Sequence, residues 1–147
     1  MFTPQPLYAR SFRSGFADLA EWVETSEPVE PGDVVELDPH SPGVYQLSTG
    51  HCSRFVGGVI STEPAVVLGY ESSSNRHALL ALTGIVPANV TNEGGSIMPG
   101  DLLVTSSTPG HATRWSGPDP CPCALVGKAL EPMTDDRGVI LVLLTAH

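Results

Sequence analysis

The fold is decided by a short stretch that occurs twice, PGDVVEL at residues 31–37 and PGDLLVT at residues 99–105. Each copy is followed by a second Pro-Gly pair, at 42–43 and at 109–110. Two further landmarks then recur in the same order: Val-Gly at 56–57 and 126–127, and Glu-Pro at 63–64 and 131–132. The spacing of about 67–70 residues between matching landmarks indicates an internal duplication. Its halves cover about 31–70 and 99–144 within one domain, 18–147.

Each Pro-Gly pair predicts a tight turn. In a type II turn, proline presets φ at the second position and glycine accepts the positive φ of the third. The segments 34–37 and 102–105 lie between two such turns, are rich in β-branched and aliphatic residues, and are followed by residues suited to return strands. We therefore expect two superposable β-hairpins, one at 33–48 and one at 101–115.

The rest of the chain completes an all-β prediction. Glycines interrupt the strand-like run 55–61, where they usually mark a bulge or a close approach of two backbones. The apolar run 78–86 is expected to form a strand shared by the two halves. Residues 17–23 place apolar and acidic residues on opposite sides of a helix and predict one or two helical turns. Two hairpin halves that close on each other would form a small duplicated β-barrel or clip-like sandwich.

The composition excludes several classes of function. A chain of 147 residues with a formal net charge of −9 lacks the basic face that nucleic acid requires. No stretch approaches the about 18 apolar residues of a membrane span, and the proline-broken N-terminus lacks the pattern of a secretory signal. The glycines form no phosphate-binding motif and no serine sits in a nucleophile elbow. We expect neither a cofactor nor a turnover enzyme.

The charge divides the chain into an N-terminal arm and a body. Residues 1–17 carry Arg10 and Arg13 and no acid, whereas residues 18–147 carry five basic and sixteen acidic residues, a charge of −11. Half of the acids fall in one stretch: Asp18, Glu21, Glu24, Glu27, Glu30, Asp33, Glu36 and Asp38. This stretch is either a solvated face or a docking surface for a basic partner, of which a neighbouring copy's arm is the nearest candidate.

The arm is expected to join copies of the chain. Its prolines suit an extended segment that lies along an edge or groove, and it offers four large apolar side chains as anchors: Phe2, Leu7, Tyr8 and Phe12. We expect these anchors to be buried against another subunit, with Arg10 or Arg13 near acids of the 18–38 stretch. A head-to-tail contact of this kind gives a filament when it stays open and a ring or trimer when it closes.

The three cysteines leave three alternatives open. Cys52 aligns in the repeat opposite the residue between Cys121 and Cys123, so a disulfide from Cys52 to either of them is geometrically reasonable. Cysteines that stay reduced and only pack are the second alternative. A zinc site completed by His51 or His111 is the third, but the repeated Cys-x₂₋₄-Cys spacing of such sites is missing. We expect no metal.

Five motifs of this chain resemble those of a known module: GFADLAEW at 15–22, PGDVV at 31–35, GVISTEPAVV at 58–67, PGDLLVTS at 99–106 and GKALEP at 127–132. Over roughly residues 15–145 the chain is similar to autoproteolytic intramolecular chaperone domains of glutamic-peptidase type. Domains of this family end phage tail spikes, pre-neck appendages and some bacterial surface fibre proteins.

The resemblance implies assembly of fibrous proteins, usually as trimers, and self-cleavage near Asp18 and Glu21. Two carboxylates three residues apart could share a proton and act as acid and base on one peptide bond. Alternatively, Asp18 caps a short helix and Glu21 is solvated on it.

Three functions follow from these observations. The first is a self-assembling structural subunit of a fibre, filament or symmetric oligomer, on an extracellular surface or in a virion, with copies of itself as partners. The second is an autoproteolytic chaperone domain that uses Asp18 and Glu21. The third is a β module that binds a small ligand or carbohydrate through Trp115. They predict, respectively, a large buried area on residues 1–17, a shorter product on a denaturing gel, and an exposed aromatic pocket.

Overall fold

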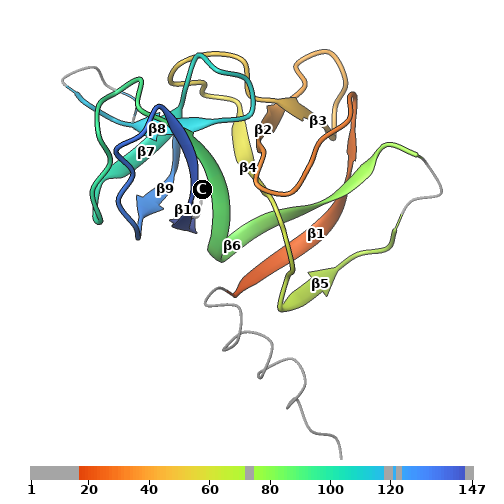
Figure 1. Cartoon of the computed structure of the whole chain (residues 1–147). Coiled ribbons are helices and arrows are strands. Elements are labelled where there is room, and N and C mark those ends of the chain that lie inside the picture. Colours follow the sequence, from red (N-terminus) through yellow and green to blue (C-terminus); the bar gives the residue numbers. More distant parts are fainter. Residues whose placement is uncertain (1–16, 72–74, 118–120, 122–123, 145–147) are drawn as a thin grey trace, which may run out of the picture.

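The computed structural model describes residues 17–71, 75–117, 121 and 124–144. Within these ranges the chain forms strands and no helix, and therefore no helical membrane span (Figure 1). The strands are β1 (Asp18–Thr25), β2 (Val34–Leu37), β3 (Val44–Leu47), β4 (Val56–Ile60), β5 (Val66–Leu68), β6 (His77–Thr91), β7 (Leu102–Thr105), β8 (Ala112–Arg114), β9 (Leu125–Ala129) and β10 (Arg137–Leu144). All of them belong to one sheet that closes on itself. The all-β prediction of a small barrel or sandwich is confirmed.

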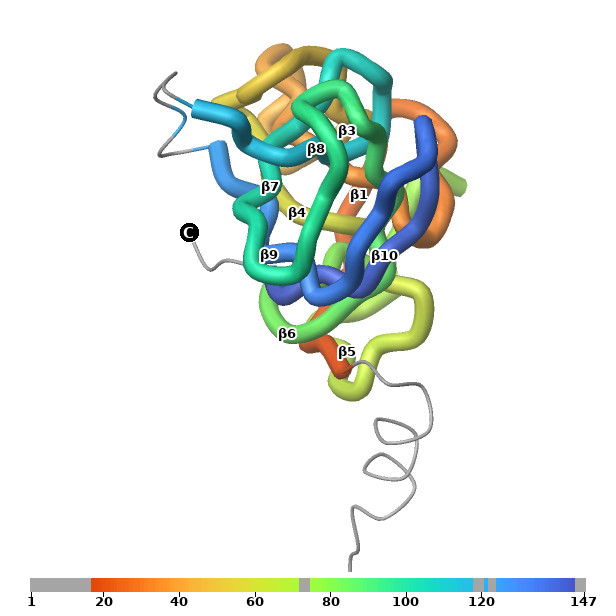
Figure 2. The backbone as a smooth tube through the Cα atoms, turned by 60° about the vertical axis from the view of Figure 1, so that its left-hand side comes forward, coloured from red at the N-terminus to blue at the C-terminus, as the bar shows by residue number. Residues whose placement is uncertain are grey.

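The strand pairings close two rings that share β6. In the first ring, β4, β2, β3 and β1 follow one another and return to β6; in the second, β8, β7, β9 and β10 do the same. The β1–β3 and β6–β8 pairings are parallel, and all other pairings within the rings are antiparallel. Both rings thus have the same topology. β5 is added outside the rings, at the end of the molecule away from the hairpins (Figures 1 and 2).

The four Pro-Gly pairs form the predicted turns. Their glycines all have positive φ: +93° at Gly32, +80° at Gly43, +96° at Gly100 and +74° at Gly110. In each turn the residue after the glycine donates its N–H to the carbonyl before the proline, as from Asp33 to Glu30 at 3.0 Å. The hairpins β2–β3 and β7–β8 are both antiparallel, so both predicted hairpins are present; their superposition stays a prediction.

β6 runs through the middle of the molecule and belongs to both rings. Its residues 77–84 pair with β1 and its residues 84–91 pair with β10, so it contains the strand expected at 78–86. Gly84 lies where the pairing changes and has a φ of +105°. A Cβ atom at this position would lie 2.3 Å from the Ala17 carbonyl oxygen. Glycine is therefore required for the close approach of β1 to β6.

A bulge interrupts the corresponding strand pair in each ring. The β2–β4 register shifts between Val35 and Glu36, next to Gly58, and the β7–β9 register shifts between Leu103 and Val104. A Cβ atom at Gly58 would lie 2.7 Å from the Ala81 carbonyl oxygen of β6. The glycine-marked irregularity expected in the 55–61 run is present.

The helical turn predicted at 17–23 is wrong, because these residues begin β1. The strand pairs with β6 from Asp18 opposite Gly84 to Glu24 opposite His77. Asp18 is a buried residue of β1, and its acidic side chain hides the two-residue alternation that marks a strand in a sequence. Pairing with β6 then decides the conformation against the local helical spacing.

The largest hydrophobic cluster draws on both halves of the chain. It includes fully buried residues of five strands: Val34, Val59, Val86, Leu103 and Val142. Because these side chains pack in one cluster, neither half has a complete core of its own. The two rings therefore stabilise each other through this shared core.

Candidate functional site

Both ends of the described chain meet at the middle of β6. Asp18, the first residue of β1, and Leu144, the last residue of β10, each pair with Gly84. The Ala17 carbonyl accepts a hydrogen bond of 2.7 Å from the Ile85 N–H. The arm therefore joins the body beside Gly84, at the residues that the family resemblance marks as functional.

Asp18 places a carboxyl group inside the protein. The residue is only 3% exposed, and neither of its carboxylate oxygens has a partner among the described residues. The hydroxyl of Ser61, directly after β4, is also buried and unpartnered there. Burial raises the pKa of Asp18; the nearby Ser61 hydroxyl partly opposes this rise but does not complete a hydrogen bond of good geometry. Because burying an unpaired carboxylate is costly, Asp18 is suited to hold a proton.

Glu21 lies on the other face of β1. Side chains alternate along a strand, so residues three apart point to opposite faces, and accordingly Asp18 is buried whereas Glu21 is exposed. Glu21 acts instead on Tyr45, whose pKa is raised first by burial and second by the charge of Glu21. In this conformation the structure does not bring the two carboxylates together as a proton-sharing pair would require.

The acidic stretch is not a uniform solvated face, because Glu36 belongs to the interior. It is 4% exposed and accepts hydrogen bonds from Gln46 at 2.8 Å, Thr49 at 3.1 Å and Ser53 at 2.7 Å. With Asp18, it makes two buried acids in a stretch that the sequence suggested would face water. A paired interior carboxylate of this kind fixes loop positions and is not free for a partner.

Asp33 also has a structural role. It accepts hydrogen bonds from the Asn89 side chain at 2.9 Å and from the Glu30 N–H at 2.8 Å, and so ties the first Pro-Gly turn to β6. Burial raises its pKa, and the hydrogen bond from the Glu30 backbone opposes the rise. The acids of the stretch that are classed as exposed are Glu21, Glu24 and Glu30. Glu27, Asp33 and Asp38 are half-buried.

β5 leaves a group of apolar side chains in water. Val66, Val67 and Leu68 are 43–45% exposed, and Tyr70, two residues beyond the strand, is 94% exposed. β5 pairs with β1, with Leu19 opposite Val66, and no other described strand pairs with it. In the sequence, Ser61 and the start of this run belong to the motif GVISTEPAVV (58–67), but neither was predicted as a candidate site.

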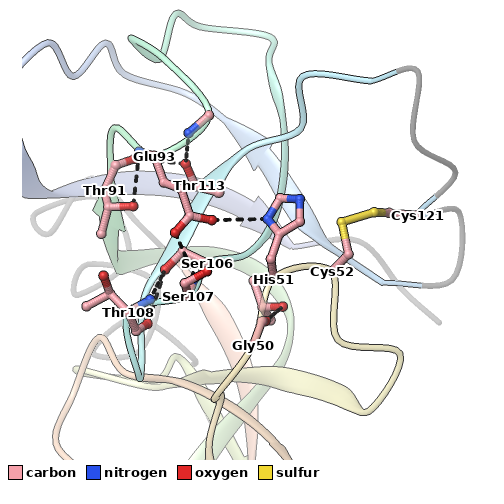
Figure 3. A network of polar contacts seen from close by, with 12 residues as sticks. Gly50, His51, Cys52, Thr91, Glu93, Ser106, Ser107, Thr108, Thr113 and Cys121 are labelled. Carbon is pink, nitrogen blue, oxygen red and sulfur yellow. Dashed lines mark hydrogen bonds and ion pairs between the residues drawn. A yellow bond between two sulfur atoms is a disulfide. The ribbon is translucent and has the colours of Figure 1, made fainter.

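A disulfide and a polar network connect the loop after β3 to the second half (Figure 3). Cys52 and Cys121 form the disulfide, with a Cα–Cα distance of 5.8 Å. His51 Nδ1 lies 3.1 Å from a Glu93 carboxylate oxygen, and the other oxygen of Glu93 accepts the Ser107 N–H at 2.9 Å. These contacts join loops and assemble no nucleophile.

Metal binding finds no support in the described part of the chain. No group of three histidine, cysteine, aspartate or glutamate side chains is close enough there to hold an ion. Cys52 and Cys121 are bonded to each other, and Cys123 lies outside the described residues.

Trp115, the residue on which the ligand-binding hypothesis depends, is half-buried. Its side chain packs against the buried cluster of Val104, Cys121 and Ala124. An open depression of about 190 Å³ lies elsewhere, lined by Thr25, Pro28, Val29, Asn75, Arg76 and His77. A binding role of Trp115 stays a prediction.

The anchors and basic residues predicted for the arm all lie outside the described residues: Phe2, Leu7, Tyr8, Arg10, Phe12 and Arg13. Their burial against a second subunit stays a prediction. What the structure does describe is the point at which the arm enters the body and the surface around it.

The fold defines an all-β domain of two strand rings with a common central strand. No family model and no curated protein matches the sequence. Two solved structures are similar: pre-mature bacteriophage phi29 gene product 12, with a TM-score of 0.64 over 88% of this chain, and the C-terminal fragment of the same gene product, with a TM-score of 0.62 over 87%. Both are 16% identical to this chain, so the likeness shows the fold alone.

The extent of the likeness is informative. This chain covers 22% of the length of the pre-mature protein but 100% of the C-terminal fragment. It thus shares its fold with a domain of a phage protein, which supports the motif-based resemblance at that level. Self-cleavage and chaperone activity of this chain stay predictions.

Proposed function

We propose that this chain is a self-assembling structural subunit related to phage appendage proteins, and that its copies associate through the N-terminal arm. The observation that carries the proposal is the apolar group at β5, where Val66, Val67, Leu68 and Tyr70 face water close to the entry of the arm. Contiguous exposed apolar surface of this kind marks an interaction site. The fold shared with a phage protein supports a virion or surface-fibre context.

The charges of the chain favour a second copy as the partner. The arm is basic and aromatic, and the body carries a charge of −11. Opposite charges steer association, whereas apolar anchors supply most of the affinity. A chain with both a basic arm and an acidic body carries the two complementary surfaces that head-to-tail assembly needs.

The test is the solution mass of the full chain and of a chain that lacks residues 1–14, measured by analytical ultracentrifugation at matched concentrations. We expect the shortened chain to stay folded and to associate less. Raising the salt concentration should weaken association of the full chain only modestly, because salt screens charges but not apolar contacts. Assembly of the shortened chain to full size would overturn the proposal.

A second candidate function is single-turnover self-cleavage, and the unpartnered carboxyl of Asp18 is the observation that favours it. A carboxyl group with a raised pKa can hold the proton that a leaving amine needs during peptide hydrolysis. Water would add across one backbone amide near Asp18 and leave a new carboxylate and a new amine. The test is incubation of the purified chain followed by a denaturing gel. We expect a shorter product that Asp18→Asn abolishes; a full-length band that persists for days rejects this candidate.

A further inference from the structure

β5 is an addition to the fold that the second ring lacks. The connection from β4 to β6 covers residues 61–76 and contains β5, whereas the matching connection from β9 to β10 covers only residues 130–136. Both connections join the same two positions of their rings. The second ring closes without an added strand, so closing the first ring does not require one either.

β5 has the properties of an edge strand to which a further strand can add. Its three residues are apolar and 43–45% exposed, and β1 lies on one side only among the described strands. Natural sheets prevent their edges from pairing with another chain by lysine, proline, bulges or very short edge strands. β5 is short, with three residues, but it carries no lysine, proline or bulge. An extended peptide can add to such an edge through backbone hydrogen bonds, with alternate side chains setting specificity.

The surroundings of β5 select a basic peptide with apolar anchors. Glu21, which is exposed, pairs with Leu68 across the β1–β5 ladder. Glu71 follows Tyr70 directly; its side chain is 58% exposed, and its carboxylate lies 3.6 Å from His77 Nε2. An apolar edge flanked by carboxylates attracts a segment that alternates apolar and cationic side chains.

The arm contains one segment of this kind, LYARSFR at residues 7–13. It follows the last proline of the arm, so every residue in it has a backbone N–H to donate. In an extended conformation Tyr8, Arg10 and Phe12 share one face, which alternates aromatic and cationic groups. We propose that residues 7–13 of a second copy pair with β5.

The chain direction favours a second copy over the same chain. β1 and β5 are parallel, with Leu19 beside Val66, so β1 begins at the same end of the sheet as β5. The chain's own arm would have to reverse direction to lie along β5, whereas the arm of a neighbour can approach from outside. Sixteen extended residues span up to about 50 Å, which is enough to reach across to another molecule.

The experiment is a complementation between full-length variants, and it rests on the proposed function. Val67→Lys blocks the edge and keeps the arm, whereas Phe12→Asp blocks the arm and keeps the edge. We expect each variant alone to be monomeric and an equal mixture to form dimers in ultracentrifugation, because one arm can still meet one edge. Met98→Lys is the matched control, since Met98 is a comparably exposed apolar residue (54%) away from β5, and it should assemble like the parent chain.

A labelled peptide of residues 1–16 added to the full chain provides a second readout. Val67→Lys and Tyr70→Ser should each lower its affinity about tenfold, because they remove central anchors, and Met98→Lys should leave it unchanged. Tyr70 is 94% exposed, so its replacement cannot disturb the core. If Phe12→Asp blocks assembly but Val67→Lys and Tyr70→Ser assemble fully, the arm docks elsewhere: this inference fails and the proposed function stands. If the Phe12→Asp variant and the chain that lacks residues 1–14 both assemble fully, this inference and the proposed function both fail.

Discussion

Replacing Gly84 with alanine should test the central geometry of this fold. The added Cβ atom would lie 2.3 Å from the Ala17 carbonyl oxygen and 2.8 Å from the Asp18 Cα atom, both backbone atoms that cannot rotate away. The φ of +105° adds strain of about 1–2 kcal/mol for a residue with a side chain. Moving β1 away would also break the hydrogen bond from the Ile85 N–H to the Ala17 carbonyl, at a cost of about 1–3 kcal/mol for a buried group left unpaired.

Together these effects predict a loss of about 3 kcal/mol or more in the free energy of unfolding. Gly43→Ala is the matched control, because Gly43 has a φ of +80° but no atom within 4 Å of its added Cβ; it should lose only the strain of about 1–2 kcal/mol. Urea unfolding measures the stability loss of both variants. With an m-value of about 2 kcal/mol/M, the Gly84 variant should unfold at a urea midpoint about 1.5 M lower than the parent chain. Equal losses in the two variants would show that β1 does not approach β6 as described.

Three further predictions concern the disulfide, the buried carboxyl and the turns. Cys52→Ser opens a link across a sequence separation of 69 residues and should cost about 4 kcal/mol by chain entropy, whereas Cys123→Ser should change little in the same thermal scan. The raised pKa of Asp18 means that the folded chain binds this proton more tightly than the unfolded chain does, so stability falls as pH rises from about 4 through the raised pKa. The Asp18→Asn variant should therefore have a higher melting temperature than the parent chain at pH 7, but not at pH 3. Gly100→Val should lower the free energy of unfolding by about 1–2 kcal/mol, because its Cβ has no atom within 4 Å and only the backbone strain counts. Gly32→Val should lower it more, because its Cβ meets the Asn89 side chain at 3.1 Å. Unchanged unfolding midpoints in both variants would reject the turn assignment.

The sequence could predict the hairpins because their signals are local. A Pro-Gly pair restricts its own backbone whatever surrounds it, and the four glycines do have positive φ. The shared strand β6 was also predictable, because an apolar run between two matching halves is most easily buried by pairing with both of them. The conformation of β1 was not, because it depends on partners in β6 about sixty residues away in the chain.

The candidate site was predictable only in part. The motifs directed attention to Asp18, but its burial beside Ser61 depends on how β1 and β4 meet β6, which no local pattern encodes. The charge spacing suggested that Glu36 faces water, whereas three side-chain donors hold it inside. A comparison of the lengths of 61–76 and 130–136 could have identified β5 as an addition, since the repeat supplies its own reference.

The meeting of Asp18 and Leu144 at Gly84, where the described part of the chain starts and ends, has a mechanical consequence. A pull applied through these two residues acts at one point on β6. The backbone hydrogen bonds that join β1 and β10 to β6 would therefore break one after another (Figure 1). Strands peeled in sequence yield at lower force than strands sheared together, because few bonds resist at any moment. The domain is therefore better placed beside a line of tension than within it. If it does open, the Cys52–Cys121 link keeps the residues between these cysteines out of the extended path and shortens its reach by about 230 Å.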